Sequence, residues 1–304
     1  MYKKPTLLSL TILALSVLWS CQPAGNENQD KEEWLSLFNG KDLTGWDIKF
    51  SGYPMNVNLL ETFRAEDSMI RVSYDKYERF NEDYGHMYYQ TPFSYYRIKF
   101  DYRFLGEQLE GGATWNVRNS GIMFHSQSAV SNEYDQDFPV SVELQLLGGL
   151  GTGTRTTANV CTPGTTVDMD GEINRKHCIS STSKTYDGDQ WVHVEATVLG
   201  DQSMIFVVEG DTVLTFENPR IDGGFIRKME DGSDWSKFGV EHPEDWIAKE
   251  GNTVKEGYIA LQAESHAIDF KNLELLDLCG CMDKSAKNYK SYFVKDDASK
   301  CLYD

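Results

Sequence analysis

The sequence has few long hydrophobic runs and few basic residues. One apolar stretch, residues 7–19, has the length of a signal-peptide core but is too short to span a bilayer as a helix, and no other run could do so. Lys and Arg number 29 against 47 Asp and Glu, which gives a formal charge of −18. A surface this acidic repels phosphate backbones, which argues against nucleic acid as a partner. It is typical of a soluble monomer that binds a neutral or cationic small molecule.

The N-terminal segment is typical of a lipoprotein signal. Lys3 and Lys4 precede the apolar run, and Ser20, a small residue, directly precedes Cys21. We therefore expect residues 1–20 to be removed and Cys21 to carry lipid, with the polar residues 21–33 as a tether. An ordinary secretory signal is the alternative. The lipid reading places the protein in the cell envelope, anchored to a membrane whose face is undetermined.

Cysteine is also scarce, and export permits disulfides. If Cys21 is lipidated, five cysteines remain, so at least one is unpaired. Two pairs each bracket a polar segment and are the expected disulfides, while Cys279 is left over. The expected pairs are Cys161 with Cys178, and Cys281 with Cys301.

Helical periodicity is nearly absent, whereas alternation of apolar and polar residues is common. A period of two places alternate side chains on opposite faces of a sheet. It predicts strands at 96–104, 140–146 and 191–198, a hairpin of 204–208 with 212–216, and a last strand pair of 257–263 with 267–275. One short helix is predicted at 243–250, with Pro near its first turn and Gly after its end.

Many strands without interleaved helices predict an all-β, antiparallel sandwich or barrel over residues 34–278. Long loops are predicted at 128–139, 148–184 and 221–256, and loops of this length usually carry function. Residues 279–304 are short, bracketed by Cys and rich in Asp, Lys and Tyr, and are expected to form a small C-terminal appendage.

The strand periodicity also gathers polar side chains. Glu143 and Gln145 fall opposite the apolar face of their strand, and the same test puts Gln262 with Glu264, His193 with Glu195, and His125 with Met123. If these strands are neighbours, the Glu, Gln and His side chains line one groove. The alternative is a solvated sheet face, which any antiparallel sheet has.

Several chemistries lack their sequence pattern. The Glu-x-Asp-x-x-Glu run of sandwich glucanases is incomplete after Glu143, although Glu195 or Glu264 could supply a second carboxylate from another strand. The Gly-rich run 148–154 lacks the ending of a phosphate loop, and no Ser-His-Asp set is visible. A divalent metal ion could be held by His125 with Glu143 or by His266 with Glu264, although a hydrogen-bonded or surface His is the simpler interpretation.

Four ordered segments resemble the 3-keto-disaccharide hydrolase family, long labelled a domain of unknown function. They are residues 37–46, the Asn-Ser-Gly-Ile motif at 119–122, the Glu-x-Gln strand at 143–145, and the closing strands with Gln262, His266 and 270–273. The chain departs from the family pattern in two places. His125 stands where the family often has Arg, and the last motif reads Ser265-His266-Ala267. Residues 279–304 resemble a Cys-bracketed, Asp-rich module of exported Bacteroidetes proteins. Such a tail could serve as a disulfide-closed structural unit or could bind calcium.

The resemblance implies a concanavalin A-like jelly roll that cleaves 3-keto-glycosides. The ketone at sugar carbon 3 acidifies the hydrogen on carbon 2, a base removes it, the glycosidic oxygen leaves and water adds. Such chemistry needs one base and one electrophile, for which a divalent metal ion is an option. We expect Glu143 or His266 as base, with Asn119, His125, Gln145, Gln262 and Glu264 binding substrate or metal. The alternatives are a non-catalytic glycan-binding lipoprotein, with platforms such as Trp115 and Tyr134, and a conventional glycosidase.

Overall fold

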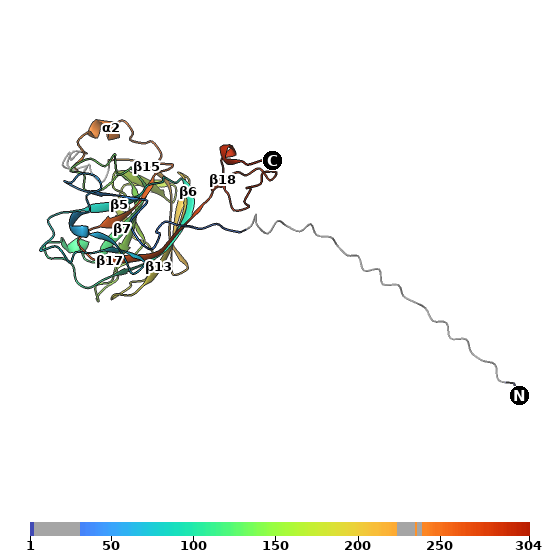
Figure 1. The fold of residues 1–304 in the computed structure, drawn as a ribbon, viewed down its shortest axis with the longest axis horizontal. Helices are drawn as coiled ribbons and strands as arrows, with labels where there is room; N and C mark the ends of the chain where they lie inside the picture. The colour runs from blue at the N-terminus through green and yellow to red at the C-terminus, as the bar shows by residue number, and fades with distance from the viewer. Residues whose placement is uncertain (3–30, 224–234, 236–238) are drawn as a thin grey trace.

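The computed structural model describes residues 1–2, 31–223, 235 and 239–304 (Figure 1). Most of the expected signal peptide and tether, including Cys21, lies outside these residues. In the part of the chain that is described, no helix is long and apolar enough to cross a membrane.

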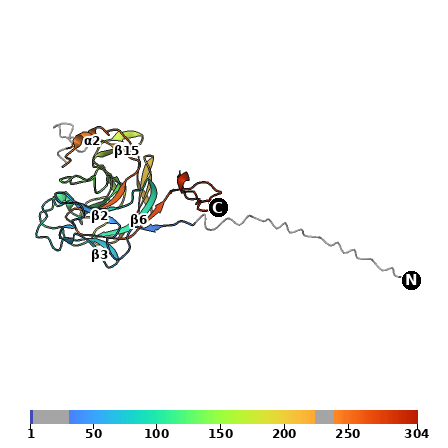
Figure 2. The ribbon, with the colours of Figure 1, turned by 45° about the horizontal axis from the view of Figure 1, so that its top comes forward.

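Two antiparallel sheets packed face to face form the body of the molecule (Figures 1 and 2). Within the described residues, the ten-stranded sheet has the order β11 (Glu172–Asn174), β10 (Thr165–Met169), β15 (Asp211–Ile221), β14 (Ser203–Val208), β13 (Val192–Leu199), β6 (Tyr95–Phe104), β17 (Ile268–Asp277), β4 (Met69–Val72) and β3 (Phe63–Glu66), and β1 (Leu35–Ser36) also pairs with β17. The seven-stranded sheet has the order β12 (Cys178–Ile179), β9 (Asn159–Cys161), β8 (Val142–Leu147), β7 (Asn119–Ser126), β16 (Tyr258–Ala263), β5 (Gly85–Tyr89) and β2 (Trp46–Phe50). The predicted jelly-roll sandwich is confirmed.

The core lies between the sheets because each contributes the apolar half of its alternating strands. In β13 every second residue from Val192 is buried, and β6 alternates in the same way after Tyr95. Leu144 of β8 and Phe124 of β7 enter the same core from the opposite sheet. The polar residues that alternate with these side chains therefore point away from the core, which places a polar outer face on each sheet.

Two sequence-based expectations about the elements are wrong. The last two predicted strands do not pair: β16 pairs with β5 and β7, whereas β17 pairs with β6 and β4 in the other sheet. The predicted loop at 148–184 contains β9, β10, β11 and β12, whose short lengths leave too few alternations for a recognisable period. The predicted helix is α2 (Pro243–Ile247), which begins at the expected residue.

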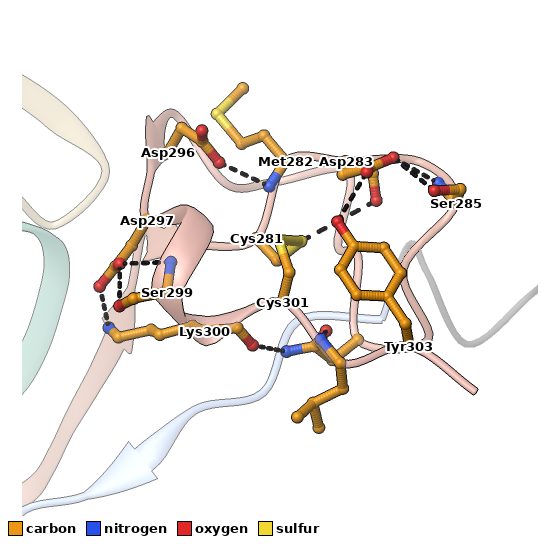
Figure 3. Close-up of a disulfide and its surroundings, with 12 residues drawn as sticks. Cys281, Met282, Asp283, Ser285, Asp296, Asp297, Ser299, Lys300, Cys301 and Tyr303 are labelled. Carbon is orange, nitrogen blue, oxygen red and sulfur yellow. Dashed lines mark hydrogen bonds and ion pairs between the residues drawn. A yellow bond between two sulfur atoms is a disulfide. The ribbon is translucent and has the colours of Figure 1, made fainter.

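The C-terminal tail is a small unit closed by the disulfide Cys281–Cys301 (Figure 3). A parallel pair, β18 (Cys279–Gly280) with β19 (Lys295–Asp296), connects it to the end of β17, and a 3-10 turn, η4 (Ala298–Lys300), precedes the second cysteine. Its carboxylates close turns: Asp297 accepts from the backbone and hydroxyl of Ser299, and Asp296 accepts from the backbone of Met282 at 3.0 Å. The described contacts give these acids a structural role.

The beginning of the described chain lies beside this tail. Glu33 Oε1 and Lys290 Nζ are 2.6 Å apart, and β1 follows two residues later along the edge of β17. Both ends of the folded part therefore leave from the side of the ten-stranded sheet, as the two views show (Figures 1 and 2).

Candidate active site

A cavity of about 480 Å³ opens on the outer face of the seven-stranded sheet. Its floor carries five polar side chains. Four come from three adjacent strands, and the fifth comes from the residue that follows the third strand. They are Asn119 on β7, Glu143 and Gln145 on β8, and Gln262 and Glu264 at the end of β16. Four of them, Glu143, Gln145, Gln262 and Glu264, belong to the sequence-predicted groove, and they meet because β8, β7 and β16 are neighbours. Asn119 was expected at the site from the family resemblance.

Gly121 explains how the Glu143 carboxylate fits against the sheet. The two residues lie on adjacent strands, with Gly121 opposite Gln145 and Met123 opposite Glu143. A Cβ atom at Gly121 would lie 2.3 Å from Glu143 Oε1, so only glycine lets the Glu143 side chain lie flat over β7. The glycine of the Asn-Ser-Gly-Ile motif therefore has a direct role in shaping this cavity.

Burial perturbs both carboxyl groups of the floor. Glu143 is 6% exposed, and burial raises its pKa to about 8. Burial also raises the pKa of Glu264 well above its usual range, the nearby Glu143 raises it further, and Arg155 acts in the opposite direction. Glu264 is held in place by Asn119, whose Nδ2 donates to Glu264 Oε1 at 3.1 Å. Burial therefore favours the neutral form of both carboxyl groups, and a negative charge on Glu143 adds to this effect at Glu264.

Two amide oxygens of the floor have no partner among the described residues. These are Asn119 Oδ1 and Gln262 Oε1, and both are buried. Buried acceptors without a partner are costly unless a ligand, ion or water satisfies them. Together with the carboxylates of Glu143 and Glu264 they form a set of hard oxygen donors, the type that holds Ca²⁺ or Mg²⁺, or that receives sugar hydroxyls.

The walls of the cavity are mainly apolar. Leu147 and the Cys161–Cys178 disulfide line it on the same sheet face as Glu143, and Trp115, Phe138 and Pro163 complete the apolar lining. The disulfide joins directly opposite residues of β9 and β12, and its presence confirms the predicted pairing. Cys279 is free, as expected.

His125 does not reach this cavity. Tyr258 pairs with Ser126 but Ala260 pairs with Met123, so two residues of β7 lie opposite one residue of β16. His125 has φ 48° at this β-bulge, and the extra residue turns its side chain away from the face shared by Asn119 and Met123. Its Nε2 instead lies 3.0 Å from the Gly200 carbonyl oxygen. The predicted metal pair of His125 with Glu143 is not assembled.

His266 and the polar pair of β13 also lie elsewhere. His266 lines a separate cavity with Arg118 and Asp187, where burial lowers its pKa to about 4. His193 and Glu195 are on the outer face of the ten-stranded sheet, with His193 Nδ1 2.7 Å from Asp101 Oδ1. Alternation along one strand shows which residues share a face but cannot show which sheet the strand joins. For this reason His193 and Glu195 were expected in the same groove as Glu143.

Two residues near the floor escaped the sequence reasoning. Arg155 lines the cavity and its Nη1 donates to the carbonyl oxygens of Gly148 and Arg118 at 2.7 and 3.2 Å, but it falls in a segment predicted as loop. His86 on β5 lies directly opposite Gln262, and burial followed by the charge of Lys49 lowers its pKa to about 3. His86 could have been found from the sequence, because it is a polar residue within an otherwise apolar strand.

Comparison with known proteins finds one family model and several solved structures that are similar to this chain. The model of the 3-keto-alpha-glucoside-1,2-lyase-like domain matches residues 33–276. Two candidate glycosyl hydrolases from Parabacteroides distasonis align at 16% and 18% identity, covering 81% and 80% of this chain and 99% and 93% of their own, each with a TM-score of 0.44. A carbohydrate-binding module from Bacillus subtilis aligns at 10% identity over 77% of this chain and 96% of its own, with a TM-score of 0.39. No curated protein matches the sequence significantly.

Proposed function

The chain belongs to the 3-keto-alpha-glucoside-1,2-lyase-like family, and from this premise we propose that it cleaves 3-keto-glycosides with Glu143 as the base. The observation that supports this role is the pair of buried carboxyl groups on the cavity floor. Burial raises the pKa of both groups, to about 8 in Glu143, and the nearby charge of Glu143 raises the pKa of Glu264 further, which separates the two. Such a separation is the usual arrangement of a base and an acid that act on one substrate.

Each group has one task in the proposed reaction. Glu143 takes the proton from sugar carbon 2, and the electrons of that C–H bond form an enolate with the ketone at carbon 3. The enolate expels the glycosidic oxygen from carbon 1, and Glu264 donates its proton to that oxygen. Water then adds at carbon 1 and carbon 2 regains a proton, so the net change is hydrolysis.

The remaining polar groups stabilise and orient. Arg155 places a positive charge at the cavity, where an enolate oxygen would be stabilised. Asn119, Gln145 and Gln262 offer amide groups to the sugar hydroxyls. A divalent cation bound by the floor oxygens would supply the same electrophilic help when present.

A conventional glycosidase is the second candidate, because Glu143 and Glu264 together supply the two carboxyl groups that it needs. The test incubates the protein with a 3-keto-glucoside and, separately, with the unoxidised parent glucoside. Cleavage of the keto sugar alone supports the proposal, and cleavage of the parent supports the conventional glycosidase. Glycan binding without turnover of either would favour a binding protein.

Glu143→Gln is the matched variant for this assay. It keeps the volume and hydrogen-bonding capacity of the side chain but removes its basicity. We expect turnover of the 3-keto-glucoside to fall by about 10²–10⁴-fold, the usual contribution of a positioned base. Glu195→Gln, on the outer face of the other sheet, is the control and should be neutral. Unchanged turnover in Glu143→Gln would exclude Glu143 as the base.

A further inference from the structure

The cavity separates into a polar floor and an apolar wall. The floor carries five polar side chains, which can serve the hydroxyl groups of one sugar ring. Its apolar wall begins beside these residues with Leu147 and the Cys161–Cys178 disulfide on the same sheet face, and continues with Trp115, Phe138 and Pro163. A second sugar placed against this wall would lose water from its hydroxyl groups and find few partners, which is costly.

The two polar side chains beside this wall both have protein partners, and Arg155 is the one assigned above to the enolate oxygen. Arg155 Nη1 donates to the carbonyl oxygens of Gly148 and Arg118. His177 hydrogen-bonds the backbone of Thr162, and burial lowers its pKa to about 4, so it is neutral. The wall therefore offers mainly apolar surface to whatever extends beyond the sugar on the floor.

Trp115 lines the cavity with a ring that is only half buried. Its indole stacks on Tyr84, with ring centroids 6.2 Å apart and an interplanar angle of 13°, and Tyr84 also contacts Phe138 at 4.9 Å. Although Tyr84 covers one face, Trp115 remains 52% exposed. A large apolar ring fixed on one side and open on the other is suited to stacking against a flat group.

The cavity volume leaves room for such a group. At about 480 Å³ it falls in the range of sites that enclose a whole small-molecule ligand, roughly 300–1,000 Å³. A hexose ring held by the floor would therefore leave space between itself and Trp115.

We infer that the substrate is the 3-keto-glycoside of an aromatic alcohol, whose aglycone stacks on Trp115 while the keto sugar lies on the floor. This inference rests on the proposed function and specifies its substrate class. Trp115 is then a specificity residue that contacts the leaving group and takes no part in proton transfer.

The test compares three 3-keto-glucosides that share the reacting sugar, each as both anomers. Their leaving groups are benzyl alcohol, methanol and a second glucose. Because all three are alcohols, differences in kcat/KM reflect binding more than leaving-group acidity. We expect kcat/KM for the benzyl substrate to exceed the other two by at least about 10-fold. Trp115→Ala should lower it by about 10- to 100-fold for the benzyl substrate, the usual contribution of one stacking contact, and change the methyl substrate by less than about 3-fold.

Two further variants make the result specific. Trp115→Phe keeps a ring on Tyr84 and should recover much of the loss, which also shows that the segment still folds. Trp191→Ala removes a tryptophan that contacts Arg103 and Lys271 at the ten-stranded sheet, and it should leave all three rates unchanged.

The outcomes separate the two claims. Equal or better cleavage of the 3-keto disaccharide, or an equal effect of Trp115→Ala on the benzyl and methyl substrates, would overturn the aromatic aglycone and leave the proposed function standing. No cleavage of any of the three would overturn the proposed function and this inference with it.

Discussion

At the scale of single residues, the site depends on how closely Glu143 approaches β7. We expect Gly121→Ala to force the Glu143 carboxylate out of its position, because the new Cβ would lie 2.3 Å from Oε1. Overpacking of this kind costs about 1–3 kcal/mol of stability, and turnover should fall by at least about 10-fold because the base is displaced. Thermal unfolding and initial rates measure the two effects.

A double-mutant cycle isolates the cause. In a Glu143→Ala background the atoms that meet the new Cβ are gone, so Gly121→Ala should then cost little stability. An equal stability loss in both backgrounds would show that Gly121 serves the backbone of β7 and not the Glu143 side chain.

The raised pKa of Glu143 predicts two opposite pH effects. Because the proposed base must be ionised, kcat/KM should rise with pH and level off above about pH 8. The free energy of unfolding should instead fall as the pH rises. Burial raises the pKa from 4.5 to about 8, so the folded state binds more protons than the unfolded state between these values, and stability is lost as pH rises through them. Glu143→Gln should reduce the fall in melting temperature between pH 5 and pH 9, and an unchanged fall would contradict the assignment.

At the scale of strands and loops, the sequence predicted well what depends on one strand alone. The alternation of β6, β8 and β13 gave their positions and their buried faces, and it placed Glu143 and Gln145 on the outer face. It also predicted that polar residues from several strands would meet, which holds for Glu143 and Gln145 with Gln262 and Glu264, whereas Asn119 was expected only from the family resemblance.

What depends on pairing between strands could not be predicted in the same way. The β-bulge at His125 inserts one residue, and a shift of one residue reverses the face of every side chain beyond it. The segment after β16 passes from one sheet to the other, so the closing strands share no hydrogen bonds. Arg155 lies in the segment 148–184, whose strands are only two to five residues long. Strands this short show no recognisable alternation, so the segment was predicted as a loop.

The disulfide between β9 and β12 is expected to stabilise this segment. It closes a loop with a sequence separation of 17, for which the chain-entropy model predicts about 3 kcal/mol. The double substitution Cys161→Ala/Cys178→Ala should lower the denaturation midpoint accordingly and reduce turnover, since the disulfide lines the cavity.

The matched control removes the other disulfide. Cys281→Ala/Cys301→Ala opens the tail, which does not line the cavity, and it should leave turnover unchanged. Loss of turnover in the tail variant, or none in the first, would contradict these roles.

At the scale of the whole molecule, the lipoprotein signal remains a prediction about residues outside the described part. Cys21→Ser should move the protein from the membrane fraction to the soluble fraction, because the acceptor of the lipid is lost. Fractionation with labelled fatty acid measures both properties. A variant that stays in the membrane fraction, with no label on the unaltered protein, would show that Cys21 is not the anchor.

The attachment of the first strand to the ten-stranded sheet also bears on where substrate can come from. If Cys21 is held in a membrane, the anchored end of the chain meets the body at β1, on the sheet opposite the cavity. The acidic body is repelled by anionic lipid headgroups, which favours orientations with the cavity toward the water. Such an arrangement captures glycosides that diffuse in the surrounding fluid and leaves glycolipids of its own bilayer out of reach.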